Sequence, residues 1–192
     1  MSKQKVAAAA MKLFSEMGYH RTSMDDIARE ADVAKGTLYY HFKGKAELFE
    51  TLVVDGFAQM TDTIQEALED DTPVGEQMRI IVRKQVELFL EYSPLVHLIS
   101  NELSNGIEAD VLARIETKRR AYVDFIASVL RQGTEEQWLD PLPHDLAAVG
   151  IIGLLEKICL HYSNNKGLYT REELDRTVER FIVGPLLAGG AN

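Results

Sequence analysis

The sequence lacks most of the features by which enzymes, secreted proteins and membrane proteins are recognised. It has one cysteine, Cys159, so no disulfide can form within the chain, and we expect a reducing cytoplasm. Its start lacks the long apolar segment of a signal peptide, and no run of about 18 uncharged apolar residues predicts a membrane span. No glycine-rich nucleotide loop, paired-cysteine motif or HExxH motif occurs, so nothing indicates an enzyme, a bound metal or a cofactor.

Acidic residues are missing from one short stretch of an otherwise acidic chain. The 192 residues carry a net charge of −9. Residues 1–48 nevertheless hold eight Lys/Arg against six Asp/Glu, and the segment Val33–Lys45 holds three lysines and no acid. This asymmetry predicts two regions with different partners, and the basic region suits an anionic partner.

Strand-like alternation is absent as well, and apolar residues recur at every third or fourth position along most of the chain. Ser23 with Asp26, and Thr170 with Glu173, have the spacing of helix-starting capping boxes. We therefore predict an all-α protein, with a small domain over residues 1–45 and a larger one over 46–192. The nine expected helices span about 6–17, 24–31, 34–41, 45–69, 74–92, 94–103, 107–131, 144–163 and 170–187.

The three short helices before residue 45 match a helix-turn-helix arrangement, in which the last helix enters the DNA major groove. Lys35 would supply charge there, Thr37 a small donor and acceptor, and Gly36 room for close backbone approach. The hydroxyl and ring N–H groups of the Tyr39–His41 segment can reach phosphates. Alternative interpretations remain open, because basic runs are often only solvated surface, tyrosine pairs are often core, and structural α-hairpins share this pattern.

The stretch "AAAAMKLFSEMGYHRTSMDDIAREADVAKGTLYYHFKGKAELF" resembles the N-terminal domain of TetR-family transcriptional regulators. The resemblance implies an all-α homodimer with a DNA-binding domain and a ligand-responsive domain. It implies phosphate contacts at Thr22, Ser23 and Lys45. It also implies recognition-helix contacts at Lys35, Gly36, Thr37, Tyr39, Tyr40 and His41, and a miniature core of Leu13, Phe14, Ile27, Val33, Leu38 and Phe42.

Two positions depart from the family pattern. Glycine is common in the turn where this chain has Asp32, but aspartate can adopt the left-handed conformation, so we expect the turn to survive. Serine is common where this chain has Ala34, which has no hydroxyl to cap a helix or to bind DNA.

In the larger domain, the resemblance implies that the last two long helices form the dimer contact. Gly150 and Gly153 lie one turn apart in a very apolar helix, and glycine inside a helix costs about 1 kcal/mol, so close helix approach is the expected reason. The interface residues that we expect are Gly150, Gly153, Leu154, Val178, Phe181 and Ile182. The alternative is that both helices only complete the core of one subunit.

A pocket for a small-molecule effector would lie among the helices from 45 to 163. Its candidate lining residues are Phe57, Met60, Phe89, His97, Tyr122, Phe125 and Glu156, each of which could equally be ordinary core or surface. Glu156 lies in an apolar helix, where a carboxylate needs a partner. That partner could be Lys157 of the partner subunit, Arg119, a ligand or water.

These features predict a cytoplasmic, ligand-responsive transcriptional regulator, most simply a repressor. It would bind a palindromic double-stranded DNA operator as a homodimer and leave the operator when a small, largely apolar effector binds. The alternative is a helical interaction protein whose basic N-terminal face binds a protein or an anionic surface rather than specific DNA. Such a protein would show no sequence preference on DNA.

Overall fold

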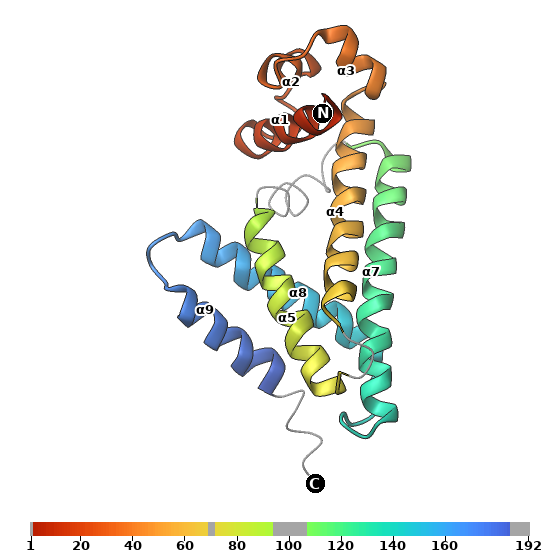
Figure 1. Cartoon of the computed structure of the whole chain (residues 1–192), viewed down its shortest axis with the longest axis vertical. Helices are drawn as coiled ribbons and strands as arrows, with labels where there is room; N and C mark the ends of the chain where they lie inside the picture. Colours follow the sequence, from red (N-terminus) through yellow and green to blue (C-terminus); the bar gives the residue numbers. More distant parts are fainter. Residues whose placement is uncertain (1, 69–71, 94–106, 185–192) are drawn as a thin grey trace. The chain divides into compact units, whose positions relative to one another are not determined.

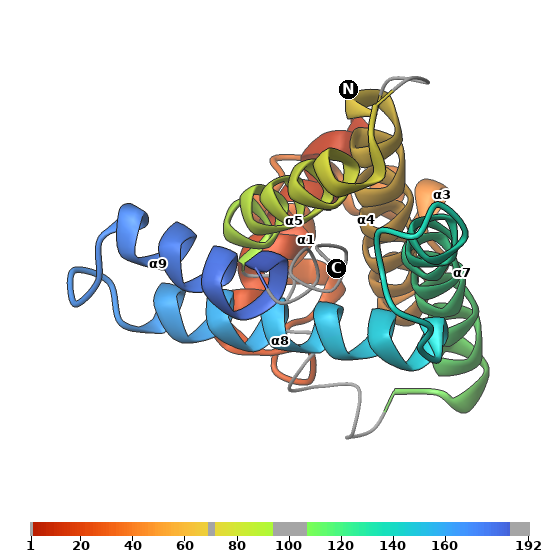
Figure 2. The ribbon, with the colours of Figure 1, turned by 90° about the horizontal axis from the view of Figure 1, so that it is seen from below.

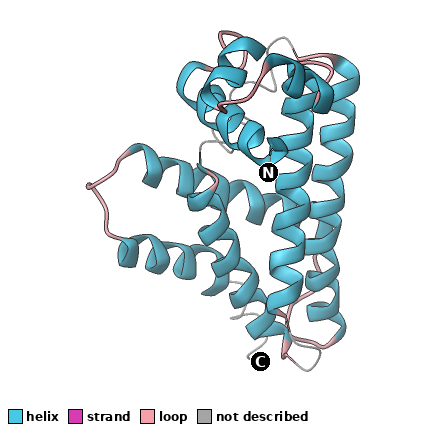
Figure 3. Cartoon of the chain, turned by 45° about the horizontal axis from the view of Figure 1, so that its top comes forward, coloured by secondary structure: helices cyan, strands magenta, loops and turns pink. Residues whose placement is uncertain are grey.

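The computed structural model describes residues 2–68, 72–93 and 107–184. Over these residues the chain is all-α, as predicted, with eight α-helices, one π-helical turn and no strand beyond an isolated backbone bridge between Lys166 and Tyr169 (Figure 3). The helix expected over 94–103 lies outside the described residues. The described helices otherwise follow the predicted order.

The chain divides into two compact units, one formed by Met1–Ala58 with Pro94–Lys118 and the other by Gln59–Ser93 with Arg119–Asn192. Helices α4 (Lys45–Ala67) and α7 (Ala109–Glu135) each contribute residues to both units. The boundary between these compact units therefore differs from the predicted domain boundary at residue 45. That the DNA-binding domain ends at residue 45 stays a prediction.

In the first unit, helices α1 (Ser2–Met17), α2 (Met24–Glu30) and α3 (Lys35–His41) pack against one another (Figure 1). The rings of Phe14, Tyr19 and Phe49 are in mutual contact, with centroids 5.2–6.1 Å apart. Of the predicted miniature core, four residues are buried and two are half-buried. The buried ones are Phe14, Ile27, Leu38 and Phe42, and the half-buried ones are Leu13 and Val33.

The turn between α2 and α3 depends on a left-handed residue. Asp32 has φ 52°, which confirms that aspartate takes the place of glycine there. The Asp32 amide donates to the Arg29 carbonyl and the Val33 amide donates to the Ala28 carbonyl. This pair of bonds is a Schellman motif, which satisfies carbonyls at the end of α2 and redirects the chain into α3.

Asp32→Val should therefore destabilise the protein by about 1–2 kcal/mol, because a β-branched residue at positive φ clashes with its own backbone. Asp32→Gly is the matched control, and its free energy of unfolding should stay within about 0.5 kcal/mol of the wild type, since glycine adopts this conformation freely. Urea unfolding of both variants measures the difference. Equal stabilities for the two variants would show that the left-handed turn is not required.

In the second unit, helix α5 (Val74–Glu91) packs on α8 (His144–Asn164), and α9 (Arg171–Val178) packs along α8 (Figure 2). The buried face of α8 consists of Ala148, Ile151, Leu155 and Cys159, spaced by three and four residues. The predicted capping box is present at the start of α9, where Thr170 and Glu173 exchange hydrogen bonds. The capping box predicted at the start of α2, Ser23 with Asp26, is present as well.

The end of α9 differs from the prediction, because α9 continues into a π-helical turn, η1 (Glu179–Val183). The sequence placed Val178, Phe181 and Ile182 on one apolar face. A π turn carries more residues than an α turn and rotates the following side chains about the axis. As a result Ile182 is 3% exposed, whereas Phe181 is 69% exposed. The π turn thus moves Phe181 from the inner face to the surface.

Candidate nucleic-acid interface

The first unit carries a shallow hollow of about 460 Å³ that gathers five of the predicted DNA contacts. Thr22 and Ser23 approach it from the start of α2, Lys35 and Tyr39 from α3, and Lys45 from α4. These residues are separated by up to 23 positions in the sequence. The small core beneath α2 and α3 is what brings them together.

The first turn of α3 carries Lys35, whose ammonium lies 2.7 Å from a carboxylate oxygen of Asp25 on α2. This hydrogen-bonded ion pair stabilises the charged form of Lys35 and raises its pKa. Both side chains are exposed, so solvent weakens their attraction and Lys35 can exchange Asp25 for a phosphate or a base. Ala34 precedes the helix without a side-chain cap, as expected from its missing hydroxyl.

Most of the remaining α3 candidates face solvent. Tyr40 is 85% exposed and Tyr39 is 44% exposed. Leu38, on the inner face of the same helix, is fully buried. A side chain at Gly36 would meet nothing within 4 Å, so the backbone there is open to a close approach. Thr37 and His41 are half-buried, and a 2.8 Å hydrogen bond joins His41 to Ser2 at the start of α1. The residue identities therefore suit a groove-reading helix with aromatic flanks.

Thr22 and Ser23 play different parts in the turn before α2. The Ser23 hydroxyl caps α2 by accepting from the Asp26 amide, and its bonds to Asp26 lower the pKa of that carboxyl. Thr22 is 1% exposed, and its hydroxyl faces the carbonyls of Leu13 and Gly18 at 3.2 and 2.8 Å. The Thr22 hydroxyl is therefore turned inward, and a phosphate contact at this residue stays a prediction.

Two charged residues of the hollow escaped the sequence-based prediction. Arg21 is exposed at its edge, with Nε donating to the Met17 carbonyl at 2.6 Å, and Asp25 places a carboxylate beside Lys35. Both lie within two residues of a predicted contact, so proximity to Thr22 and Ser23 was the available signal. They give the hollow charges of both signs. A surface with both signs selects one orientation of a bound partner more strongly than a uniformly basic surface would.

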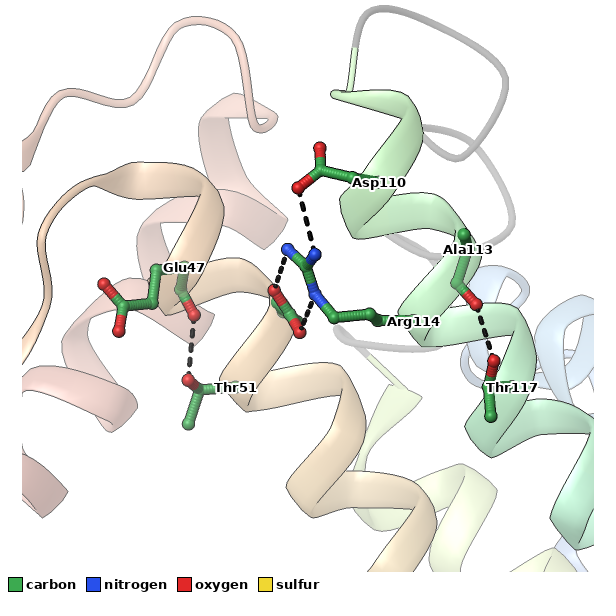
Figure 4. A network of polar contacts seen from close by, with 7 residues as sticks. Glu47, Thr51, Asp110, Ala113, Arg114 and Thr117 are labelled. Carbon is green, nitrogen blue, oxygen red and sulfur yellow. Dashed lines mark hydrogen bonds and ion pairs between the residues drawn. The ribbon is translucent and has the colours of Figure 1, made fainter.

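The start of α7 is joined to α4 by Arg114, whose guanidinium makes two hydrogen bonds to Glu50 at 2.6 and 2.8 Å. Figure 4 shows that Arg114 also reaches Asp110 one turn earlier, at 2.9 Å. These bonds raise the pKa of Arg114 and lower that of Asp110. Bidentate pairing fixes the direction as well as the distance between the two helices within the first unit.

Comparison with known families agrees with this geometry. The family "Bacterial regulatory proteins, tetR family" matches residues 6–52, and the "Tetracyclin repressor-like, C-terminal domain" matches residues 71–186. The chain belongs to the TetR family. It is therefore a DNA-binding transcriptional regulator of helix-turn-helix type with a ligand-binding C-terminal domain, and not an enzyme.

Several relatives of this TetR-family chain match it over nearly its whole length. The HTH-type transcriptional regulator YhgD of Bacillus subtilis is 26% identical over 189 residues, covering 97% of each protein. The structure of the regulator FadR from Bacillus subtilis in complex with stearoyl-CoA has a TM-score of 0.82 at 21% identity, covering 97% of this chain and 98% of FadR. AibR in complex with isovaleryl coenzyme A and operator DNA has a TM-score of 0.79 at 22% identity, covering 95% and 99%.

The predicted dimer residues of the TetR-family second unit fall into two groups. Val178 and Ile182 are 3% exposed within their own chain, so they pack inside the subunit, and their place in an interface stays a prediction. Gly150, Leu154 and Phe181 are exposed and Gly153 is half-buried. Added side chains at Gly150 and Gly153 would meet nothing within 4 Å. This second group offers exposed surface to which a partner subunit could bind.

Helix α8 has an outward apolar face opposite its buried one. Leu146, Val149, Gly150 and Gly153 follow the spacing of one helix face, and the two larger side chains are 68% and 44% exposed. Among the described residues α8 alone is long and apolar enough to cross a membrane by length and composition, and 22% of its most apolar window is buried within the chain. The same two properties suit a helix that another protein surface covers.

The predicted effector-pocket residues are in different environments. Phe89 and Tyr122 are buried, Met60, Phe125 and Glu156 are half-buried, Phe57 belongs to the first compact unit, and His97 lies outside the described residues. Burial raises the pKa of Tyr122, and Gln85 lies beside its hydroxyl. The Glu156 carboxylate is 3.5 Å from Lys157 of its own chain, which answers in part the question of its partner.

Gln85 is a buried polar residue that the sequence-based prediction missed. It is fully buried in α5, among Ile81, Val82 and Phe89 in the apolar pattern of that helix. The signal was available, because Gln85 occupies a core position four residues from Ile81 and from Phe89. A polar side chain at such a position serves either core specificity or the recognition of a polar group.

Proposed function

We propose that this TetR-family regulator is a cytoplasmic homodimeric repressor that binds a palindromic operator and is released by an acyl-CoA. The exposed face of α3 is the observation that carries the DNA-binding part of the proposal. Lys35, Tyr39 and Tyr40 lie there on a short helix whose Leu38 is held in the core. Together with Ser23 and with the open backbone at Gly36, these side chains offer both phosphate and base-edge contacts.

The outward face of α8 supports the homodimer. Leu146, Val149 and Leu154 expose apolar surface there, and Gly150 and Gly153 leave room for a second helix to approach. Phe181, turned outward by η1, adds a large apolar side chain. A two-fold dimer presents two recognition helices, which suits two half-sites about one DNA turn apart.

An acyl-CoA as effector is supported by two proteins of similar fold, FadR in complex with stearoyl-CoA and AibR in complex with isovaleryl coenzyme A. An acyl chain also agrees with the largely apolar effector expected from the sequence. The effector would act by population shift, binding more tightly to a form of the dimer in which the two recognition helices no longer match the operator. A differential affinity of this kind typically changes operator affinity by about 5- to 150-fold.

Selection of bound sequences from random DNA, followed by titration with acyl-CoAs of increasing chain length, tests the proposal. We expect a palindromic consensus, and release of that DNA by at least one acyl-CoA but not by free coenzyme A or by the matching fatty acid. A consensus without release by any acyl-CoA would contradict the effector class. Binding without sequence preference would instead favour the alternative, in which the basic face binds a protein or an anionic surface.

A further inference from the structure

The ammonium of Lys45, the first residue of α4, is surrounded by backbone carbonyls. Its Nζ donates to the carbonyl oxygens of Tyr19 at 2.7 Å, Thr22 at 2.9 Å and His20 at 3.3 Å. It also lies 4.4 Å from the centroid of the Tyr19 ring. An ammonium has three N–H donors, and the three carbonyls match them in number.

The three carbonyls belong to the turn that leads from α1 into α2. Ser23, which caps α2, follows this turn directly. On its inner side the turn is fastened by the buried Thr22 hydroxyl, which faces the carbonyls of Leu13 and Gly18. Lys45 fastens the same turn from the side of α4. The Lys45 ammonium therefore adds a polar tie between this turn and the start of α4 to the apolar contact between Tyr19 and Phe49.

Lys45 is also held by an apolar, weakly hydrated neighbour. Tyr19 is 4% exposed, and burial raises its pKa to about 12, so its ring stays neutral and its face attracts the cation. If the Lys45 ammonium turned to a DNA phosphate, at least one of the three backbone carbonyls that it contacts would lose this hydrogen-bond donor. Leaving a backbone carbonyl without a donor has a cost that a new phosphate contact must first offset.

We propose that Lys45 is a positioning residue. Its hydrogen bonds to the carbonyls of Tyr19, His20 and Thr22, which we call the latch, hold α4 to the turn before α2 and thereby keep α2 and α3 in the geometry that reads the operator. This inference rests on the proposed operator binding, and it differs from the phosphate contact that the family resemblance implies for Lys45. The two roles lead to different effects on specific and non-specific DNA.

Lys45→Met removes the ammonium and keeps the aliphatic stem, and its binding to operator and to random DNA should be measured over a range of salt concentrations. We expect operator affinity to fall by about tenfold or more, while the salt slope and the affinity for random DNA stay close to wild type, so the ratio of specific to non-specific binding falls. Loss of a phosphate contact would instead weaken both kinds of DNA and lower the slope by about one unit. That result would overturn the latch.

Lys45→Arg is the matched variant that keeps the charge. An arginine binds phosphate at least as well as lysine, but its planar fork cannot direct three donors from one atom to converging carbonyls. We therefore expect Lys45→Arg to lose operator specificity about as much as Lys45→Met. Full rescue of operator affinity by arginine would contradict a latch. A general loss of folding would lower both kinds of DNA binding in both variants, which also contradicts the proposal.

Amide hydrogen exchange provides a test that does not need DNA. In Lys45→Met, the amides between His20 and Ile27 should exchange faster than in the wild type, whereas those of α9 should be unchanged. Unchanged exchange in this turn would overturn the latch even if no operator is found. Faster exchange, with no operator preference in the wild type, would uphold the structural tie between Lys45 and this turn. The same outcome would reject the proposed function and, with it, the operator-reading role of Lys45.

Discussion

Phe181→Asp is expected to dissociate the proposed dimer and to weaken binding to the proposed operator by on the order of 100-fold or more. Each subunit alone would hold one half-site, and a buried carboxylate in an apolar interface has no partner to offset its desolvation. Because Phe181 is 69% exposed within its own chain, the substitution removes little packing inside the subunit. Sedimentation equilibrium and operator titration measure the two effects.

Phe181→Leu is the control for this prediction, since leucine keeps an apolar side chain at the same outward position and should remain dimeric. The thermal unfolding of isolated Phe181→Asp subunits should also retain a cooperative transition, which separates loss of assembly from loss of folding. A Phe181→Asp protein that sediments as a dimer and binds the operator normally would place the dimer contact elsewhere than the outward face of α8 and η1.

Phe14→Ala should lower the free energy of unfolding by about 3–5 kcal/mol, the usual cost of removing a buried aromatic ring. Phe14 is 1% exposed and its ring touches Tyr19 and Phe49, with centroids 5.5 and 6.1 Å away. Operator binding should be lost well below the melting temperature of the wild type, because α1 then no longer supports α2 and α3. Urea unfolding followed by circular dichroism measures the stability.

Tyr40→Ala is the matched comparison on the same unit, since Tyr40 is also aromatic but 85% exposed. Its stability should stay within about 0.5 kcal/mol of the wild type, as for most surface substitutions. Its operator affinity should nevertheless fall, because the proposed DNA face loses an aromatic contact. If Tyr40→Ala destabilised the protein as much as Phe14→Ala, α3 would not present Tyr40 to a partner.

Local signals in the sequence predicted much of the fold. The capping boxes at Ser23 and Thr170 start α2 and α9 as expected, because capping depends on residues only three positions apart. The left-handed Asp32 was predictable for the same reason, since it follows from the conformational range of one residue type. The basic and aromatic residues of α3 could be predicted to cluster, because this prediction required only the spacing of three short helices in the sequence.

Features set by tertiary contacts were not predictable in this way. The π turn that exposes Phe181 changes which side chains face inward, and no residue type within η1 predicts such a turn. Gly150 and Gly153 were expected to allow close approach of a partner helix, and that expectation stays a prediction. Among the described residues, Gly133 is a glycine that its own chain surrounds tightly. A side chain there would come within 2.9 Å of Leu139 and 3.1 Å of Val74. Which backbone approaches which neighbour depends on the assembled helices, not on the glycine itself.

The same distinction applies to Lys45. A lysine at the start of α4 signals positive charge near DNA, which is a local inference. The carbonyls of Tyr19, His20 and Thr22 come from a turn more than 20 positions earlier, and only the folded unit brings them to Nζ. The sequence thus predicted that Lys45 lies near the candidate interface, but its hydrogen-bond partners could be identified only from the structure.

The lone cysteine of the chain provides a built-in reporter. Cys159 is 2% exposed on the inner face of α8, and burial raises its pKa to about 12. At neutral pH the thiol is therefore protonated as well as buried, so oxidants and alkylating reagents find little thiolate to attack. Labelling of the unmodified protein would therefore time the opening of α8, and an effector that tightens or loosens this helix would change that rate without any engineered probe.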